Sequence, residues 1–173
     1  MKRKNNVRLY NLLLPLWALL LLPQLWLIVI PGNFLIDSAV LLLSLHFLHI
    51  EGKKEIYKRS ILKIFLFGFL SDLAGSLLLF LSQLVDAYFG DWWYQNMTNA
   101  IAMNPFENIF AFLYVLAALL LSGGCIYLLN RRFSFRKTSL SPALQKRLSL
   151  LLAVFTAPYL FFFPSNLIYR SLF

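Results

Sequence analysis

The sequence predicts an all-α integral membrane protein, and two observations carry this prediction. Hydrophobic residues make up 60% of the 173 residues and charged residues only 13%, which lies far outside the range of soluble globular proteins. The apolar residues also gather in long stretches, and a helix of about 20 apolar residues spans the hydrocarbon core of a bilayer. We therefore predict a single helical domain over residues 1–173, a bundle of five transmembrane helices at about 9–30, 34–50, 61–85, 106–129 and 143–163.

The positions of the basic residues predict the orientation of this bundle. All but one of the 16 Lys and Arg residues precede the first span, or lie in or beside the links after the second and fourth spans; Arg170 follows the fifth. Because cytoplasmic loops keep the excess of Lys and Arg, we expect a cytoplasmic N-terminus and an outer C-terminus, in the inner membrane of a bacterium. With a net charge of +9, the basic links should also contact anionic lipids, and nucleic acid is not an expected partner.

The first two spans are separated by a predicted outer turn. Pro31, Gly32 and Asn33 follow the first apolar stretch and are typical turn residues. Pro15 and Pro23 inside the first span each remove a backbone hydrogen bond, which predicts a kink. The polar link after the second span is short, so the second and third spans should be antiparallel neighbours.

The segment over 86–104, between the third and fourth spans, is acidic, has no Lys or Arg, and is rich in aromatic residues: Tyr88, Phe89, Trp92, Trp93 and Tyr94. Since Tyr and Trp favour the headgroup level of a bilayer, we predict an outer interfacial segment, or a lid above Asp37 and Glu107.

Helix-start signals open the last two spans. Asn104 precedes Pro105 and Glu107, which predicts an N-cap, a proline at the first helical position and a glutamate that reaches back. Ser141 and Pro142 give a similar start for the fifth span.

Asp72 is the strongest candidate for a functional residue. At 1.5 Å per residue it lies about 14 Å beyond Lys63, near the bilayer midplane, where carboxylates are costly and often functional. Small and polar residues share one helix face with it: Gly68, Ser71, Gly75 and Ser76. This stripe also permits close helix packing, so a purely structural role for Asp72 is the alternative.

Depth along the spans predicts partners for Asp72. Ser44 and His46 on the second span, Ser122 on the fourth and Thr156 on the fifth should lie within about two turns of its level. Pro158 cannot donate to the carbonyl of Val154, which should leave a free acceptor at this height. Transporters bind substrates and ions at midplane sites of this kind.

A second predicted group lies in the outer half and consists of Asp37, Glu107, Asp86 and Asp91. These carboxylates would form a mouth that attracts cations. Asp37 and Glu107 also lie in first helical turns, where the helix dipole favours a carboxylate, so capping is the alternative. We expect no metal site and no cofactor, because the sequence has no zinc, nucleotide or hydrolase motif.

The stretch Gly68-Phe69-Leu70-Ser71-Asp72-Leu73 resembles a phrase in two groups of small bacterial membrane proteins. One is the substrate-binding subunits of energy-coupling-factor vitamin transporters, and the other is the MreD-type proteins of the cell-shape machinery. Both groups have five or six spans, and the resemblance implies no particular site residue.

Three functions follow from these patterns. The leading hypothesis is a transport-type or solute- or ion-binding membrane subunit that uses the Asp72 region. The second is a non-catalytic scaffold or assembly protein that binds partner helices, from other subunits or a second copy, through the Gly68–Ser76 stripe. The third is an intramembrane enzyme that uses Asp37 with Glu107.

Overall fold

The computed structural model describes residues 16–167, and this part of the chain consists of helices and their links, without a strand. Three helices are long and apolar enough to cross a membrane: Pro23–Phe47, Lys53–Leu84 and Ile109–Ser134. Large apolar side chains are exposed along the length of all three, among them Leu43, Leu70 and Leu120. Such a surface is costly in water and favourable in a lipid bilayer.

The α-helices in chain order are α1 Trp26–Phe47, α2 Lys53–Leu84, α3 Asp86–Trp93, α4 Asn99–Met103, α5 Ile109–Leu129 and α6 Pro142–Phe155. Short 3₁₀ turns occur at η1 Leu16–Leu21, η2 Pro23–Leu25, η4 Pro105–Glu107 and η6 Tyr159–Phe162. π-helical turns follow α3 at η3 Tyr94–Thr98 and α5 at η5 Asn130–Ser134.

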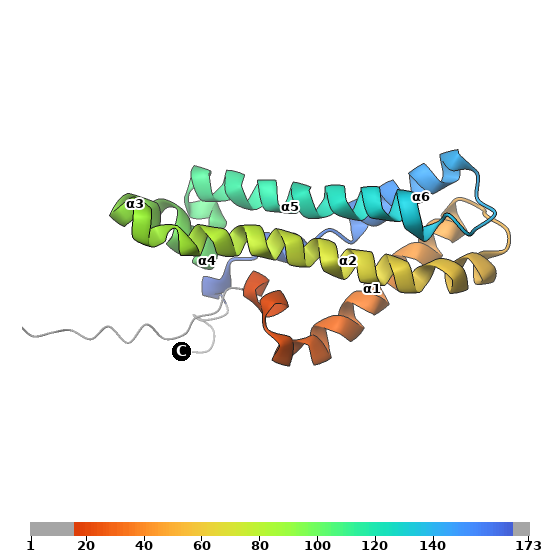
Figure 1. Ribbon diagram of the computed structural model, residues 1–173, viewed down its shortest axis with the longest axis horizontal. Helices are drawn as coiled ribbons and strands as arrows, with labels where there is room; N and C mark the ends of the chain where they lie inside the picture. Colours follow the sequence, from red (N-terminus) through yellow and green to blue (C-terminus); the bar gives the residue numbers. More distant parts are fainter. Residues whose placement is uncertain (1–15, 168–173) are drawn as a thin grey trace, which may run out of the picture.

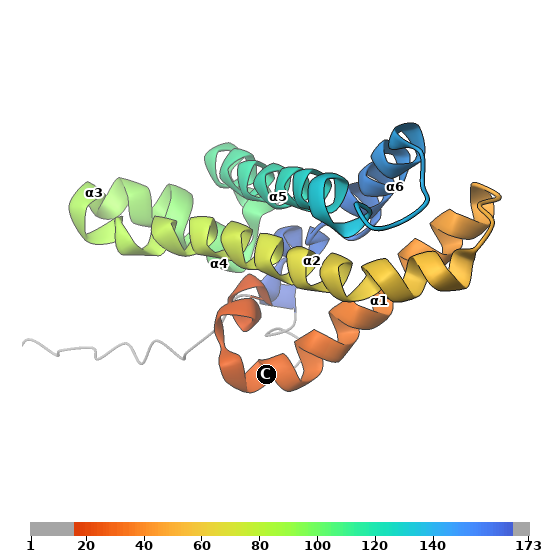
Figure 2. The same ribbon diagram turned by 45° about the vertical axis from the view of Figure 1, so that its right-hand side comes forward.

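Two of the long helices, α2 and α5, lie side by side and antiparallel, as Figure 1 shows. α1 packs against α2, and α6 packs against both α1 and α5. α1 diverges from α2 toward its own N-terminal end, which is clearest in Figure 2. The helices therefore form a bundle that is tight around the α2–α5 pair and wider on the side of α1.

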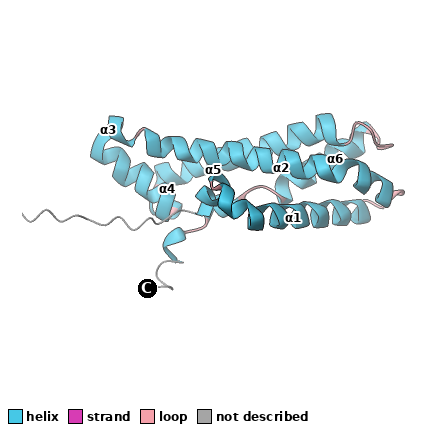
Figure 3. Cartoon of the chain, turned by 60° about the horizontal axis from the view of Figure 1, so that its bottom comes forward, coloured by secondary structure: helices cyan, strands magenta, loops and turns pink. Residues whose placement is uncertain are grey.

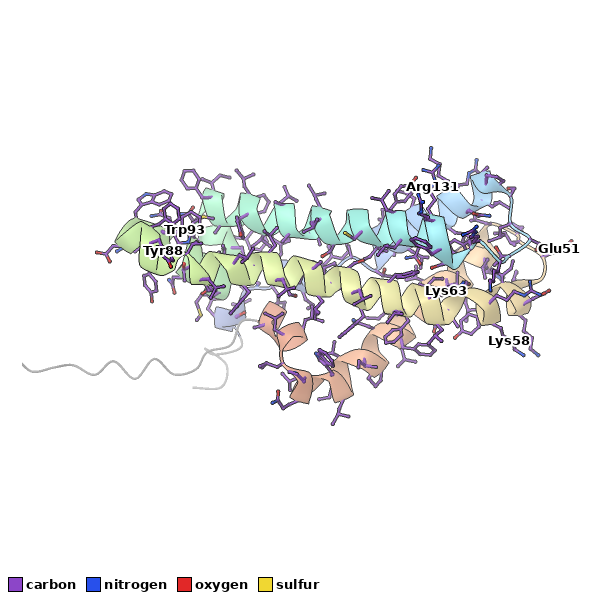
Figure 4. The ribbon with its side chains drawn as sticks, viewed as in Figure 1. Glu51, Lys58, Lys63, Tyr88, Trp93 and Arg131 are labelled. Atoms are coloured by element: carbon purple, nitrogen blue, oxygen red, sulfur yellow. The ribbon has the colours of Figure 1, made fainter. Side chains whose placement is uncertain are left out.

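The two ends of the bundle differ in charge. Figure 4 places Lys58, Lys63 and Arg131 at one end, and Tyr88 and Trp93 at the other. The first end also carries the links between α1 and α2 and between α5 and α6, and we call it the basic end. The second, which carries α3 and α4, we call the aromatic end.

The predicted turn between the first two spans is wrong. α1 continues through Pro31, Gly32 and Asn33 as one helix, and the cartoon in Figure 3 shows no loop there. Pro31 is exposed, and its missing N–H costs only the bond to the carbonyl of Leu27. The remaining backbone bonds of an apolar helix keep their full value in a bilayer, so one proline does not end it.

The predicted fifth span is also shorter than expected. α6 ends at Phe155, and the 3₁₀ turn η6 follows after a break at Pro158. The carbonyl of Val154 is not free, because the hydroxyl of Tyr159 donates to it. The proline therefore ends the helix, and the hydroxyl of the next residue, Tyr159, donates to the carbonyl that Pro158 cannot bond.

The start of α5 differs from its prediction by one turn. Asn104 caps the 3₁₀ turn η4 through the backbone N–H of Phe106, and Asn108 caps α5 through the N–H of Phe110 at 2.8 Å. Glu107 does not reach back to a backbone N–H; its carboxylate accepts from the side chain of Asn104. Two successive Asn caps thus replace the single one that we predicted.

The aromatic segment forms helical turns that double back at Gly90, whose φ is 67°. Trp93 points inward, and its indole N–H donates to the carbonyl of Ser82 at 2.9 Å. Tyr88 is 86% exposed and Trp92 is 55% exposed. The segment therefore packs against the end of α2 with one face and presents aromatic rings outward with the other.

Candidate functional site

A cavity of about 600 Å³ lies between α1, α2 and the chain that follows α6. Its volume falls within the usual range for small-molecule sites. Most of its wall is apolar, and the polar side chains that interrupt this wall include Asn33, Asp37, Asp72 and Thr156.

α1 contributes one helical face to this cavity. Asn33 and Asp37 are four residues apart, so their side chains lie one above the other, and both line the cavity. Asp37 is only 4% exposed. The carboxyl group is therefore held away from the lipid surface and turned toward α2.

α2 contributes a second carboxyl group to the cavity, and it too presents two residues that are four positions apart. Gly68 and Asp72 are four residues apart and both line the cavity, and Asp72 is 7% exposed. A Cβ atom at Gly68 would lie 3.2 Å from Oδ2 of Asp37, so the missing side chain leaves room for Asp37 to approach α2. Asp37 and Asp72 are close enough to interact electrostatically.

The broken end of α6 supplies the third wall. Thr156 is the residue after the last helical residue, and its hydroxyl donates to the carbonyl of Leu152 at 2.9 Å. Its side chain lines the same cavity as Asp37. Pro158 then turns the chain, and the apolar residues after it line the cavity.

Two buried polar atoms of this site have no hydrogen-bond partner, namely Oδ1 of Asp72 and Nδ2 of Asn33. Within residues 16–167, no Lys, Arg or His lines the cavity to balance its two carboxyl groups. A buried polar group without a partner is costly, and a buried charge more so. The arrangement is therefore suited to a ligand that brings a hydrogen-bond donor and a positive charge to Asp72.

The predicted partners of Asp72 divide into two sets. Thr156 lines the same cavity as Asp72. Ser122 does not line the cavity, and its hydroxyl donates instead to the backbone carbonyl of Ser71 at 2.9 Å, between α5 and α2. Ser71 itself donates to the carbonyl of Phe67. These two serines join helices and do not face the ligand space.

Ser44 and His46 lie elsewhere. His46 is exposed near the basic end, with Nδ1 at 3.5 Å from Nζ of Lys53. Ser44 is buried, but it does not line the cavity. The depth count placed them near Asp72 because it assumed a second span that starts at residue 34, whereas α1 starts at Trp26.

The predicted outer acidic group is not brought together. Asp37 faces Asp72, while Asp91 and Glu107 are exposed and do not line the cavity. Glu107 accepts from Asn104 at 3.1 Å and from Asn166 at 3.5 Å. Asp86 is the first residue of α3. Of the described side chains in the aromatic segment, none lines the cavity, so the segment does not cover this cavity as a lid.

The stripe Gly68–Ser76 is buried against the rest of the chain. A Cβ atom at Gly75 would lie 2.2 Å from Oγ of Ser122 and 3.1 Å from the carbonyl oxygen of Ala118, so Gly75 permits the close approach of α2 to α5. Ser76 is fully buried as well. The stripe therefore packs against elements of its own chain.

Asn33 is the site residue that sequence reasoning missed, because it was assigned to a turn. Its spacing of four residues from Asp37 would have revealed it if the helix had been predicted to continue. In the described part of the chain, no group of three or more His, Cys, Asp or Glu side chains is placed to hold a metal ion. No family model, curated protein or solved structure matches the sequence or fold of this chain.

Proposed function

We propose that this chain is a small membrane-embedded binding subunit of transport type, whose cavity binds a cationic solute or ion through Asp37 and Asp72. The observation that supports this most is that Asp72 lines the cavity while its buried Oδ1 atom has no hydrogen-bond partner. Ionisable groups inside a membrane bundle commonly mark substrate or ion sites. α6 ends next to Thr156, at the cavity, and interrupted helices of this kind are a feature of transporter sites.

The same proposal includes an orientation in the inner membrane. The basic end would face the cytoplasm and contact anionic headgroups, so that α1 and α5 run inward and α2 runs outward. The chain after α6 would return toward the outer side. A cytoplasmic N-terminus, with five crossings, then requires the residues before Trp26 to cross the bilayer on their own.

Single-cysteine variants test this topology in right-side-out membranes with a maleimide that does not cross the bilayer. The variants carry Cys125→Ser as background. A cysteine at Asn5 or Lys137 should be protected, and one at Asp91 should react. Reaction at Asn5 would remove one crossing and leave the site proposal standing, whereas reaction at Lys137 would overturn the orientation.

Carboxyl labelling tests the binding function. Dicyclohexylcarbodiimide is an apolar reagent that forms stable adducts with carboxyl groups in surroundings of low polarity. We expect it to label Asp72 or Asp37, and mass spectrometry of the peptides locates the adduct. Asp72→Asn should remove the adduct at that position, and Asp91→Asn should change nothing. The decisive result is protection by a cation, with Na⁺, Mg²⁺ and 4-phenylbutylammonium as probes; no protection by any of them would overturn the proposal.

A second candidate function is an intramembrane hydrolase. The specific observation that favours it is that Asp37 and Asp72 share one cavity, since paired carboxyl groups serve as acid and base in aspartic proteases. The pair predicted for such an enzyme, Asp37 with Glu107, does not form. Cation protection without cleavage of a membrane-peptide library would favour binding, and cleavage that requires both aspartates would favour the hydrolase.

The scaffold alternative finds less support. Gly68, Gly75 and Ser76 are buried within the chain, so the stripe offers no free face to a helix of another subunit. Binding to a second copy or to other subunits would use the exposed apolar faces instead.

A further inference from the structure

We infer that the ligand of the Asp37–Asp72 cavity is an organic ammonium ion with an apolar body, which enters from the hydrocarbon region of the bilayer. This inference rests on the proposed function and specifies the class of ligand. Three features of the cavity carry it: the composition of its wall, the place where it opens, and the donor that Asp72 lacks.

The wall of the cavity is suited to an apolar body. Away from the two carboxyl groups it is formed by Leu20, Val29, Phe161, Phe162 and other apolar side chains. Beyond the few polar side chains, most of this wall supplies no oxygen atoms that could replace the hydration shell of a small inorganic cation. Burial of apolar ligand surface against it is favourable, at about 0.8 kcal/mol for each CH₂ group.

The cavity opens between α1 and the chain after α6. Ile36, Phe155 and Leu160 all line the cavity, yet they are 52%, 62% and 63% exposed. Ile36 belongs to a helix that can cross the membrane, and its exposed neighbour Leu35 is apolar as well. The opening is therefore bordered by a surface suited to lipid, and a ligand that partitions into the bilayer can reach it sideways.

Asp72 specifies the polar end of the ligand. Its Oδ1 atom lacks a donor, and Asp37 brings a second acceptor group to the same space. A primary ammonium group has three N–H donors, so one such group can donate to both carboxyl groups at once. None of the described residues that line the cavity is Lys, Arg or His, so the positive charge of the ligand meets no basic side chain among them.

A matched set of probes tests this inference on the full-length protein in lipid nanodiscs at pH 7. 4-Phenylbutylammonium should raise the melting temperature in a saturable manner, because a bound ligand stabilises the folded state. 4-Phenyl-1-butanol has nearly the same shape but no charge, and it should bind at least about tenfold more weakly, since hydrogen bonds to charged groups are worth that much. Methylammonium keeps the charge but lacks the body, and it should bind at least about a hundredfold more weakly.

Variants locate the effect. Asp72→Asn and Asp37→Asn should each weaken 4-phenylbutylammonium binding at least about tenfold, and the exposed Asp91→Asn should leave it unchanged. Asp37→Asn keeps the test valid if Asp72→Asn does not fold, and the melting curve without ligand reports folding directly.

The outcomes separate this inference from the function on which it rests. If Na⁺ protects the aspartates from carbodiimide while 4-phenylbutylammonium neither protects nor stabilises, the site binds an ion and the inference is overturned, but the proposed function stands. Equal binding of the ammonium ion and the alcohol would overturn the role of charge, and equal binding of methylammonium would overturn the role of the apolar body. If no cation protects, both proposals fail together.

Discussion

The two faces of α2 are built from similar residues but do different things. On the side of α5, Gly75 permits close contact, and Ser122 donates across the interface to the backbone of α2. On the side of α1, Gly68 and Asp72 border a cavity of about 600 Å³, and Oδ1 of Asp72 has no partner. Small residues on α2 thus allow close packing against α5, where the facing side chain is also small. On the other side they border a cavity, because α1 diverges from α2.

This comparison predicts that alanine substitutions at Gly75 and Gly68 have very different effects on the free energy of unfolding, and the larger effect is expected at Gly75. Gly75→Ala should lower the free energy of unfolding by about 2–3 kcal/mol, in the upper range for overpacked sites, because the added Cβ would meet Ser122 at 2.2 Å and Phe161 at 2.7 Å. Unfolding in detergent micelles measures it. Gly124→Ala on α5 is the control, since nothing lies within 4 Å of its Cβ position. Equal stability of both variants would show that α2 and α5 do not pack as closely as described.

The serine across from Gly75 sharpens the same comparison. Ser122→Ala removes the hydrogen bond to the carbonyl of Ser71 and should cost about 1 kcal/mol. It also removes the atom closest to a Cβ at Gly75, so the Gly75→Ala/Ser122→Ala double variant should be more stable than the sum of the two single changes. A double-mutant cycle measures this coupling. The contact with Phe161 remains, which limits the rescue, and strict additivity would contradict the predicted contact.

On the cavity side, the sign of the effect should reverse. Asp72→Asn should leave the ligand-free protein as stable or raise its unfolding free energy by about 1 kcal/mol, because it removes a buried carboxyl group with an unpaired oxygen. The control Asp91→Asn changes an exposed carboxylate and should have no effect. A loss of stability in Asp72→Asn alone would mean that Asp72 serves to hold helices together, which is the structural role considered above.

The smallest change is expected at Gly68. A Cβ atom there would approach only Oδ2 of Asp37, at 3.2 Å, and this side chain borders open space into which it can shift. Gly68→Ala should therefore change the unfolding free energy by less than about 0.5 kcal/mol, since the better helix propensity of alanine offsets the crowding. Its effect should appear in ligand binding instead, as a loss of a few-fold in 4-phenylbutylammonium affinity. A large loss of stability would show that α1 packs on α2 as tightly as α5 does.

The sequence by itself determined the class of the protein and the strongest candidate residue. The apolar stretches predict an all-helical chain with helices that can cross a membrane, and the structure has three such helices. The spacing of Gly68, Ser71, Asp72 and Gly75 predicts one buried face of α2, and these residues are buried. Both features are local, because hydrophobicity and a helical period of 3.6 residues depend only on neighbours in the chain.

Only the tertiary structure decided how these elements combine. Whether Pro31 ends a helix depends on how strongly the remaining backbone hydrogen bonds hold the helix together. The sequence analysis predicted a turn there, and it therefore assigned Asn33, Ser44 and His46 to the wrong positions along the helix. Asp37 and Asp72 share one cavity because Gly68 leaves space beside Asp37 and because the chain turns at Pro158. The cavity is thus built by α1, α2 and the chain after α6, which are three separate parts of the sequence. Sequence spacing fixes which residues share one helix face, but the side chains that meet across helices are set by packing, to which every helix contributes.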